Sequence, residues 1–405
     1  MQESKFSSSL HRYAIAVALC ALGLIAIGGL VTSHGVGMAV PDWPTSYGYN
    51  MFALPFSIWL TGGVFHEHTH RQWASIVGVL VVILTRWLGG KKSRLPLAII
   101  GVVELLGGFA MHLLGEEWKG AGYFLSGIGG VVLLAGIIWA HNEPAAKPLP
   151  KLGWYAFWLV QVQGLLGGLR VVLDAHVFAG TKLGVVFGIF HGCLGQAFFV
   201  LLCAIVLMTS RWWLERFVVP PSDGSPGRVN AELRTSARPV PLLLLITTAL
   251  IFLQLILGAT MRHQHAGLAI SDFPLAHGEW WPDMSAEAIH RYNATRIEVV
   301  DAEPITAVQV ALQMTHRIMA MMILGAVAFC FWQIRRSAGT EIVLRRFGCL
   351  WLALVLAQAG LGAWTVWSNK AADIATLHVV VGALTLVTGT LICIIAFRSK
   401  LPLLQ

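Results

Sequence analysis

The sequence predicts an all-α integral membrane protein made of tandem duplicated four-helix bundles, with about ten transmembrane helices in total. Three observations predict this fold. The chain of 405 residues is 56% hydrophobic and 12% charged, with a mean hydropathy of +0.71, which lies outside the usual range for a soluble domain. Several apolar stretches reach the roughly twenty residues needed to span a hydrocarbon core. A long internal repeat divides the chain into two similar halves.

Ten apolar segments are expected to cross the membrane as helices. In chain order they cover residues 13–33, 72–89, 95–114, 122–141, 152–173, 183–209, 240–260, 308–333, 343–367 and 375–397. The first segment runs past twenty residues and no small-residue cleavage site follows it. We therefore expect a retained helix and not a removable signal peptide.

Lys and Arg are concentrated in alternate loops, which predicts the orientation of the chain. Basic residues lie before the first span, after the second, before the fifth, in the central linker and between the eighth and ninth, whereas 34–66 contains none. Both termini are therefore expected on the cytoplasmic side of the cell (inner) membrane. The net charge of +8 is explained by this asymmetry, so it does not indicate a nucleic-acid partner.

The repeat consists of matching motifs in the same order. "GMAVPDWPTSYG" at 37–48 returns as "GLAISDFPLAHG" at 267–278, "THRQWASIVG" at 69–78 matches "THRIMAMMILG" at 315–325, and "QGLLGGLRV" at 163–171 matches "QAGLGAWTV" at 358–366. We expect a first half at 1–210 with an inserted hairpin at 95–141, a polar cytoplasmic linker at 211–239, and a second half at 240–405. The glycine clusters in the third pair of motifs suit close approach of a flat macrocycle or, equally, of a neighbouring helix.

Four of the fifteen histidines recur at equivalent places. His70 and His191 lie in the first half, and His316 and His378 in the second, all near the expected extracytoplasmic ends of their helices. Two neutral imidazoles from facing helices ligate one iron axially, as in haem-binding bundles. Zinc needs three or four ligands, and neither half has Cys or carboxylate partners at suitable spacing. The sequence thus predicts one haem site in each half, and packing roles for the six cysteines.

One acidic residue distinguishes the two halves. Glu67 stands three residues before His70, on the same helix face, whereas Gln313 occupies the equivalent position of the second half. A carboxylate at the edge of a membrane span is costly, so Glu67 is predicted to be the acid–base residue of one reactive site. Arg71 and Arg317 follow the first histidine of each pair, where a guanidinium suits either haem propionates or anchoring at the interface.

Together these features resemble the haem A synthase family of cytochrome oxidase assembly. The resemblance covers about 13–91 and 152–397, and is carried by the repeated Gly-x-Ala-x-x-Asp-aromatic-Pro segment, Glu67-x-x-His70-Arg71, the QGLLGG helix and the duplicated halves. It implies oxidation of the C8 methyl group of haem O to a formyl group, which gives haem A. It further implies that His70 and His191 hold the substrate haem, that His316 and His378 ligate a haem b cofactor, and that Glu67 acts near the methyl group.

The resemblance also implies a haem O synthase and an electron-transfer protein as partners. Two features depart from the family. The hairpin 95–141 adds two apolar segments, which leaves the orientation of the downstream helices unchanged, and the loop 34–66 lacks the cysteine pair that many bacterial relatives carry.

Two alternatives use the same sequence features. A non-catalytic dihaem cytochrome b would use the four histidines to bind two permanent haems b, and would give Glu67 no particular role. A duplicated transporter is disfavoured because the halves are parallel and their helices are not broken at mid-membrane.

Overall fold

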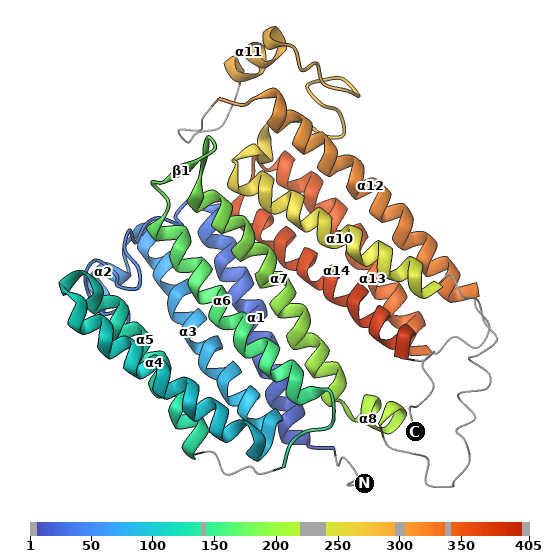
Figure 1. Cartoon of the computed structure of the whole chain (residues 1–405). Coiled ribbons are helices and arrows are strands. Elements are labelled where there is room, and N and C mark those ends of the chain that lie inside the picture. Colours follow the sequence, from blue (N-terminus) through green and yellow to red (C-terminus); the bar gives the residue numbers. More distant parts are fainter. Residues whose placement is uncertain (1–5, 139–142, 219–239, 296–303, 337–341, 399–405) are drawn as a thin grey trace. The chain divides into compact units, whose positions relative to one another are not determined.

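The computed structural model describes residues 6–138, 143–218, 240–295, 304–336 and 342–398. Within them the long helices are α1 (Ser8–Ser33), α3 (Gly62–Gly89), α4 (Arg94–Leu114), α5 (Lys119–Ile138), α6 (Leu149–Val172), α7 (Leu183–Thr209), α10 (Val240–His263), α12 (Ala307–Arg336), α13 (Ile342–Trp367) and α14 (Ala372–Arg398) (Figure 1). Shorter helices are α2 (Phe56–Trp59), α8 (Arg211–Phe217) and α11 (Ala286–Ala294), and the one named sheet pairs β1 (Val177–Phe178) with β2 (Thr181–Lys182). The predicted all-α membrane fold is confirmed.

Nine helical segments among the described residues are long and apolar enough to cross a membrane. The sequence predicted ten, and the difference arises at one junction. Gly62–Leu114 counts as a single segment of 53 residues, although a 3-10 turn at Gly90–Ser93 separates α3 from α4. A continuous helix of that length would measure about 80 Å, far more than the hydrocarbon core. Gly90 instead takes a φ of 54° at the end of α3, so each of the ten predicted spans is a separate helix.

The chain divides into two compact units, Met1–Pro220 and Pro221–Gln405. In the first unit, α1 and α6 each pack against both α3 and α7, so the four helices form a closed ring. In the second unit, α10 and α13 each pack against both α12 and α14 in the same way. The helices that carry the predicted ligands are therefore diagonal partners, α3 with α7 and α12 with α14. Of the predicted linker 211–239, the first residues form α8 and residues 219–239 lie outside the described residues.

The second helix begins at Gly62, ten residues before the predicted start at 72. The expected apolar span begins after the polar stretch "HEHTHR", although Glu67 and His70 were already expected to share one helix face. Glu67 and His68 are nevertheless buried, with exposed fractions of 4% and 0%, and both hydrogen-bond to the preceding loop. A polar helix start is stable here because its side chains find partners inside the protein.

The predicted extra hairpin consists of α4 and α5, and its last expected residues, 139–141, lie outside the described residues. Its two backbones are in close contact: a Cβ atom at Gly129 would lie 2.6 Å from the backbone nitrogen of Leu105 and 2.8 Å from the carbonyl oxygen of Gly101. Small residues allow this kind of helix packing in a membrane. Gln161 on α6 donates a 2.8 Å hydrogen bond to Oε1 of Glu104, which gives the half-buried acid of the hairpin a partner on the four-helix bundle.

Candidate functional site

His70 on α3 and His191 on α7 face each other across the first bundle. Their ring centroids lie 6.4 Å apart, with an interplanar angle of 85°. Metal–imidazole bonds are about 2 Å long, so one metal ion fits between the two rings. Nδ1 of His191 lies 3.2 Å from the carbonyl oxygen of Gln163, which leaves Nε2 available as a ligand. The structure thus brings together the pair that the sequence predicted.

His316 on α12 and His378 on α14 form the equivalent pair of the second bundle and lie within electrostatic range of each other. Gln254 donates a 2.9 Å hydrogen bond to the carbonyl oxygen of His316, and Nε2 of Gln358 lies 3.2 Å from Nε2 of His378. Among the described residues, Nδ1 of both histidines and Oε1 of both glutamines are buried without a hydrogen-bond partner. Such atoms are costly in a folded protein, and their concentration here fits a pocket that holds a ligand.

Each of the four histidines faces a glycine on the helix that precedes it in its bundle. A Cβ atom at Gly28 would lie 2.8 Å from Cε1 of His70, and those at Gly167, Gly258 and Gly362 would each lie 3.3 Å from Cε1 of His191, His316 and His378, respectively. The sequence indicated only the glycine clusters of α6 and α13. Gly28 and Gly258 were missed as site residues, although the alignment of the two repeats places them in register.

The loop at 37–48 is a compact turn organised by Asp42. Its carboxylate accepts hydrogen bonds from the backbone N–H groups of Tyr47, at 2.6 Å, and Gly48, at 2.9 Å. Tyr47 adopts a left-handed conformation with a φ of 53°. Partial burial raises the pKa of Asp42, but hydrogen bonds from Thr45, Gly48 and Tyr47 outweigh it, so the net pKa lies below its ordinary value.

The loop at 267–278 forms the same turn. The carboxylate of Asp272 accepts hydrogen bonds from the backbone N–H groups of His277, at 2.6 Å, and Gly278, at 2.8 Å. His277 has a φ of 55°, close to that of Tyr47. The repeated motif therefore forms the same turn in both halves, and each aspartate closes its own loop.

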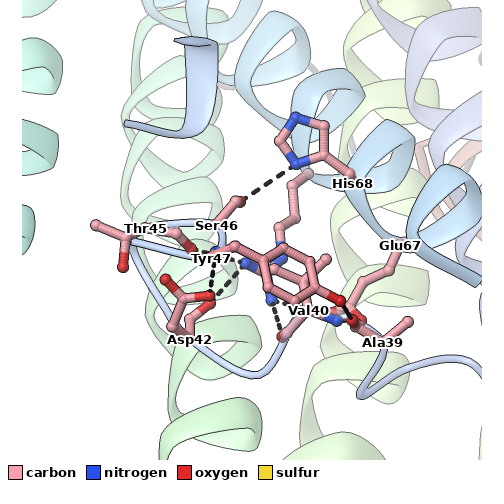
Figure 2. A network of polar contacts seen from close by, with 9 residues as sticks. Ala39, Val40, Asp42, Thr45, Ser46, Tyr47, Glu67 and His68 are labelled. Atoms are coloured by element: carbon pink, nitrogen blue, oxygen red, sulfur yellow. Dashed lines mark hydrogen bonds and ion pairs between the residues drawn. The ribbon is translucent and has the colours of Figure 1, made fainter. Parts of the chain in front are cut away.

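Glu67 on α3 lies against this first loop at Val40 (Figure 2). Arg71, one turn further along α3, also bonds to the loop. One carboxylate oxygen of Glu67 accepts a 2.8 Å hydrogen bond from the N–H of Val40, and the other forms a 2.6 Å ion pair with Arg71. Arg71 also donates to the carbonyl oxygens of Val40, Asp42 and Thr45, at 2.9, 2.7 and 3.1 Å. The Arg71 guanidinium, for which the sequence left haem propionates and anchoring at the interface open, is thus bonded to the loop and to Glu67.

Gln313 and Arg317 make the corresponding connection in the second unit. Oε1 of Gln313 accepts a 2.6 Å hydrogen bond from the N–H of Ile270, and its Nε2 donates to the carbonyl oxygen of Gly267 at 3.1 Å. Arg317 donates to the carbonyl oxygen of Asp272 at 2.7 Å. Because an amide holds this loop as well as a carboxylate holds the first, fastening the loop does not require the negative charge of Glu67.

No group of three or more His, Cys, Asp or Glu side chains suited to a metal ion occurs in the part of the chain that the structure describes. The six cysteines are free thiols: Cys193, Cys330 and Cys393 are buried, Cys20 and Cys203 are partly buried, and Cys349 is exposed. The paired imidazoles are therefore the strongest candidate metal ligands among the described residues, and two ligands per centre suit an iron whose other positions are filled by a macrocycle.

Comparisons with known proteins show which proteins this chain is similar to. The sequence pattern of a family described as "Cytochrome oxidase assembly protein" matches residues 124–390. The chain is similar to proteins named "Heme A synthase" from Caulobacter sp. (strain K31), 29% identical over 180 residues, and from Parvibaculum lavamentivorans, 32% identical over 122 residues. These alignments cover 44% and 29% of this chain, and only 48% and 30% of those relatives. A third "Heme A synthase", from Shouchella clausii, is 24% identical over 271 residues, which are 66% of this chain and 75% of the relative.

Proposed function

Because the chain belongs to the cytochrome oxidase assembly protein family, we propose that it is a haem A synthase that oxidises the C8 methyl group of haem O to a formyl group. The observation that carries this proposal is a difference between the side-chain contacts that hold the loop in each half, which we call the loop clamps. Both fasten the external loop to the helix that bears the first histidine, but only the first uses an acid, Glu67, where the second uses Gln313. A reactive centre in one half and a redox centre in the other explains this asymmetry.

The two histidine pairs have different roles in this proposal. His70 and His191 hold haem O as the substrate, and His316 and His378 hold haem b. A haem b bound in this way supplies a one-electron redox centre. The diagonal imidazoles and the glycines opposite them support both assignments, since a flat ligand needs side-chain-free helix surface beside each histidine.

In this proposal Glu67 is the general acid–base residue of the reaction. The conversion of a methyl to a formyl group takes two hydroxylations, each a two-electron oxidation, followed by loss of water from the hydrated aldehyde. Protons leave the substrate during these steps, and a positioned carboxylate accelerates such transfers by about 10²–10⁴-fold. The N–H of Val40 and the guanidinium of Arg71 hold the Glu67 carboxylate in one orientation three residues from His70.

The proposal also places the protein in the cell. The chain is a multi-pass membrane protein, and we infer that it lies in the inner membrane with both termini in the cytoplasm and both haem sites near the outer side. A haem O synthase is the source of its substrate. An electron-transfer partner accepts or supplies the electrons of each oxidation.

Analysis of the bound haems tests the proposal. The full chain would be purified in detergent, and its haems extracted and identified by chromatography and mass spectrometry. We expect haem b together with haem O, haem A or a hydroxylated intermediate. Haem b alone, at two per chain, would instead identify a dihaem cytochrome.

Substitution of Glu67 separates its chemical role from its structural one. Glu67→Gln keeps an acceptor for the N–H of Val40, as Gln313 does for Ile270, so we expect the bound haems to remain while haem A formation falls by about 10²-fold or more. Glu67→Ala removes the clamp as well, and is expected to lower haem content. Wild-type haem A formation in Glu67→Gln would remove Glu67 from the reaction.

A further inference from the structure

Arg170 is a cation near His70 and His191, and the proposed function gives it no role. It lies on the last turns of α6, and its guanidinium sits beneath Gly37, where an added Cβ atom would lie 3.0 Å from Cζ and 3.2 Å from Nη1. Its charge acts on both His70 and His191. Its N–H groups make no hydrogen bond, and no ion pair within 4 Å, with the described residues. The guanidinium is therefore available to a ligand in this pocket.

The other cation near this pair, Arg71, already has hydrogen-bond partners within the protein. Its two terminal nitrogens donate to three loop carbonyl groups and to Glu67. Release of Arg71 to bind a ligand would break the clamp of the loop. Arg170 can bind a ligand without breaking such contacts. In the first pocket Arg71 therefore holds the loop, and Arg170 is the cation that can contact a ligand.

The second unit has Thr365 at the position of Arg170, yet a cation again lies beneath the loop. A Cβ atom at Gly267, the equivalent of Gly37, would meet Cδ of Lys370 at 4.0 Å. Lys370 lies in the turn between α13 and α14, where burial and the charge of Arg262 lower its pKa. Its ammonium makes no hydrogen bond or ion pair with the described residues. The two halves thus place a basic side chain beside the equivalent glycine, Gly37 or Gly267, by different residues.

Glu67 and Asp174 act on Arg170 electrostatically, but neither forms an ion pair with it within 4 Å. A partly buried cation without a direct acidic contact is stabilised when an anion joins it. We propose that Arg170 binds a carboxylate of the ligand held between His70 and His191, and that Lys370 does the same for the ligand of the second pocket. This inference rests on the proposed function, because a haem carries two propionate carboxylates on one edge. Arg170 offers a planar bidentate fork and Lys370 a single point charge, so the propionates are held more rigidly in the first pocket.

The test compares iron protoporphyrin IX with its dimethyl ester, in which both propionates are uncharged. Haem-free full chain carrying His316→Ala, so that only the first pocket binds, would be titrated with each compound and followed by the Soret band. We expect Arg170→Gln to weaken binding of the free acid by about 10- to 100-fold, since hydrogen bonds between charged groups are involved. Binding of the ester should be unchanged, which also shows that the variant is folded, and Arg170→Lys should recover part of the loss.

The second pocket supplies the matched control, in a His70→Ala background. Thr365→Val, at the position of Arg170, should bind the free acid as its parent does, and Lys370→Gln should lose affinity for the free acid alone. An equal effect of Arg170→Gln on acid and ester, or no effect on either, would overturn the inference while leaving the haem proposal standing. Failure of the unmutated chain to bind either compound with a bis-imidazole spectrum would overturn both.

Discussion

The two halves of this chain form nearly the same loop and fasten it at the same backbone group, but with different chemistry. In the first, Glu67 accepts from the N–H of Val40 and needs Arg71 to balance its charge. In the second, Gln313 accepts from the N–H of Ile270 and donates to nearby carbonyl groups, so no charge is introduced. A neutral amide is the less costly solution in a membrane protein.

The two halves therefore share the frame of the site and differ in one residue, Glu67 or Gln313, of which we propose that only Glu67 is reactive. The shared frame consists of diagonal histidines, a glycine opposite each histidine and a loop closed by an aspartate. The differing parts are the acid at position 67 and the source of the cation beneath the loop. We therefore expect these differing residues to determine which half binds the substrate and which half binds the cofactor.

The largest expected effect comes from removing one histidine of either pair. Loss of supporting residues around a metal ligand costs about 10–100-fold in affinity, and loss of the ligand itself costs at least as much. We expect His70→Ala to retain haem b and lose haem O or haem A, and His316→Ala to do the opposite. Mass spectrometry of the haems left in each purified variant measures this. The reverse assignment of haems would exchange the roles of the two halves.

A smaller effect is expected from adding a methyl group opposite the histidines. The Cβ of Gly28→Ala would lie 2.8 Å from His70, whereas that of Gly258→Ala would lie 3.3 Å from His316. Overpacking costs about 1–3 kcal/mol, so both variants should lose haem on heating at lower temperatures than the wild type, Gly28→Ala by the larger margin. An equal or inverted order in thermal haem release would show that the first pocket relaxes more easily than its geometry indicates.

The smallest effect concerns acid and the first loop. The pKa of Asp42 in the folded chain is below its ordinary value of 3.8, so its carboxylate stabilises the loop fully above that value and progressively less as the pH falls through the folded pKa. Amide hydrogen exchange of Tyr47 and Gly48, corrected for intrinsic exchange, should show protection that declines below about pH 4. Asp42→Asn should show weaker protection that does not change with pH across this range, and an unchanged decline in this variant would assign the effect to another group.

Much of the fold could be predicted because it follows from local chemistry. Runs of apolar residues long enough to cross a bilayer predicted the ten helices, and the repeat predicted that they form two sets of four with an inserted hairpin. The four histidines were identified because they recur in register within that repeat. The start of α3 was predicted too late because burial of Glu67 and His68 depends on a loop that folds back over them.

Several features of the candidate site were decided only by the tertiary structure. The sequence alone determined a duplicated membrane bundle with one histidine pair in each half and an acid in only one of them, because apolar length, repeat register and residue type are properties of the chain itself. Packing decided that the histidines are diagonal, that Arg71 holds a loop while Arg170 does not, and that Arg170 and Lys370 lie beside the equivalent glycines of the two loops. These relations depend on which side chains meet across helices far apart in sequence, and that is fixed only when the bundle closes.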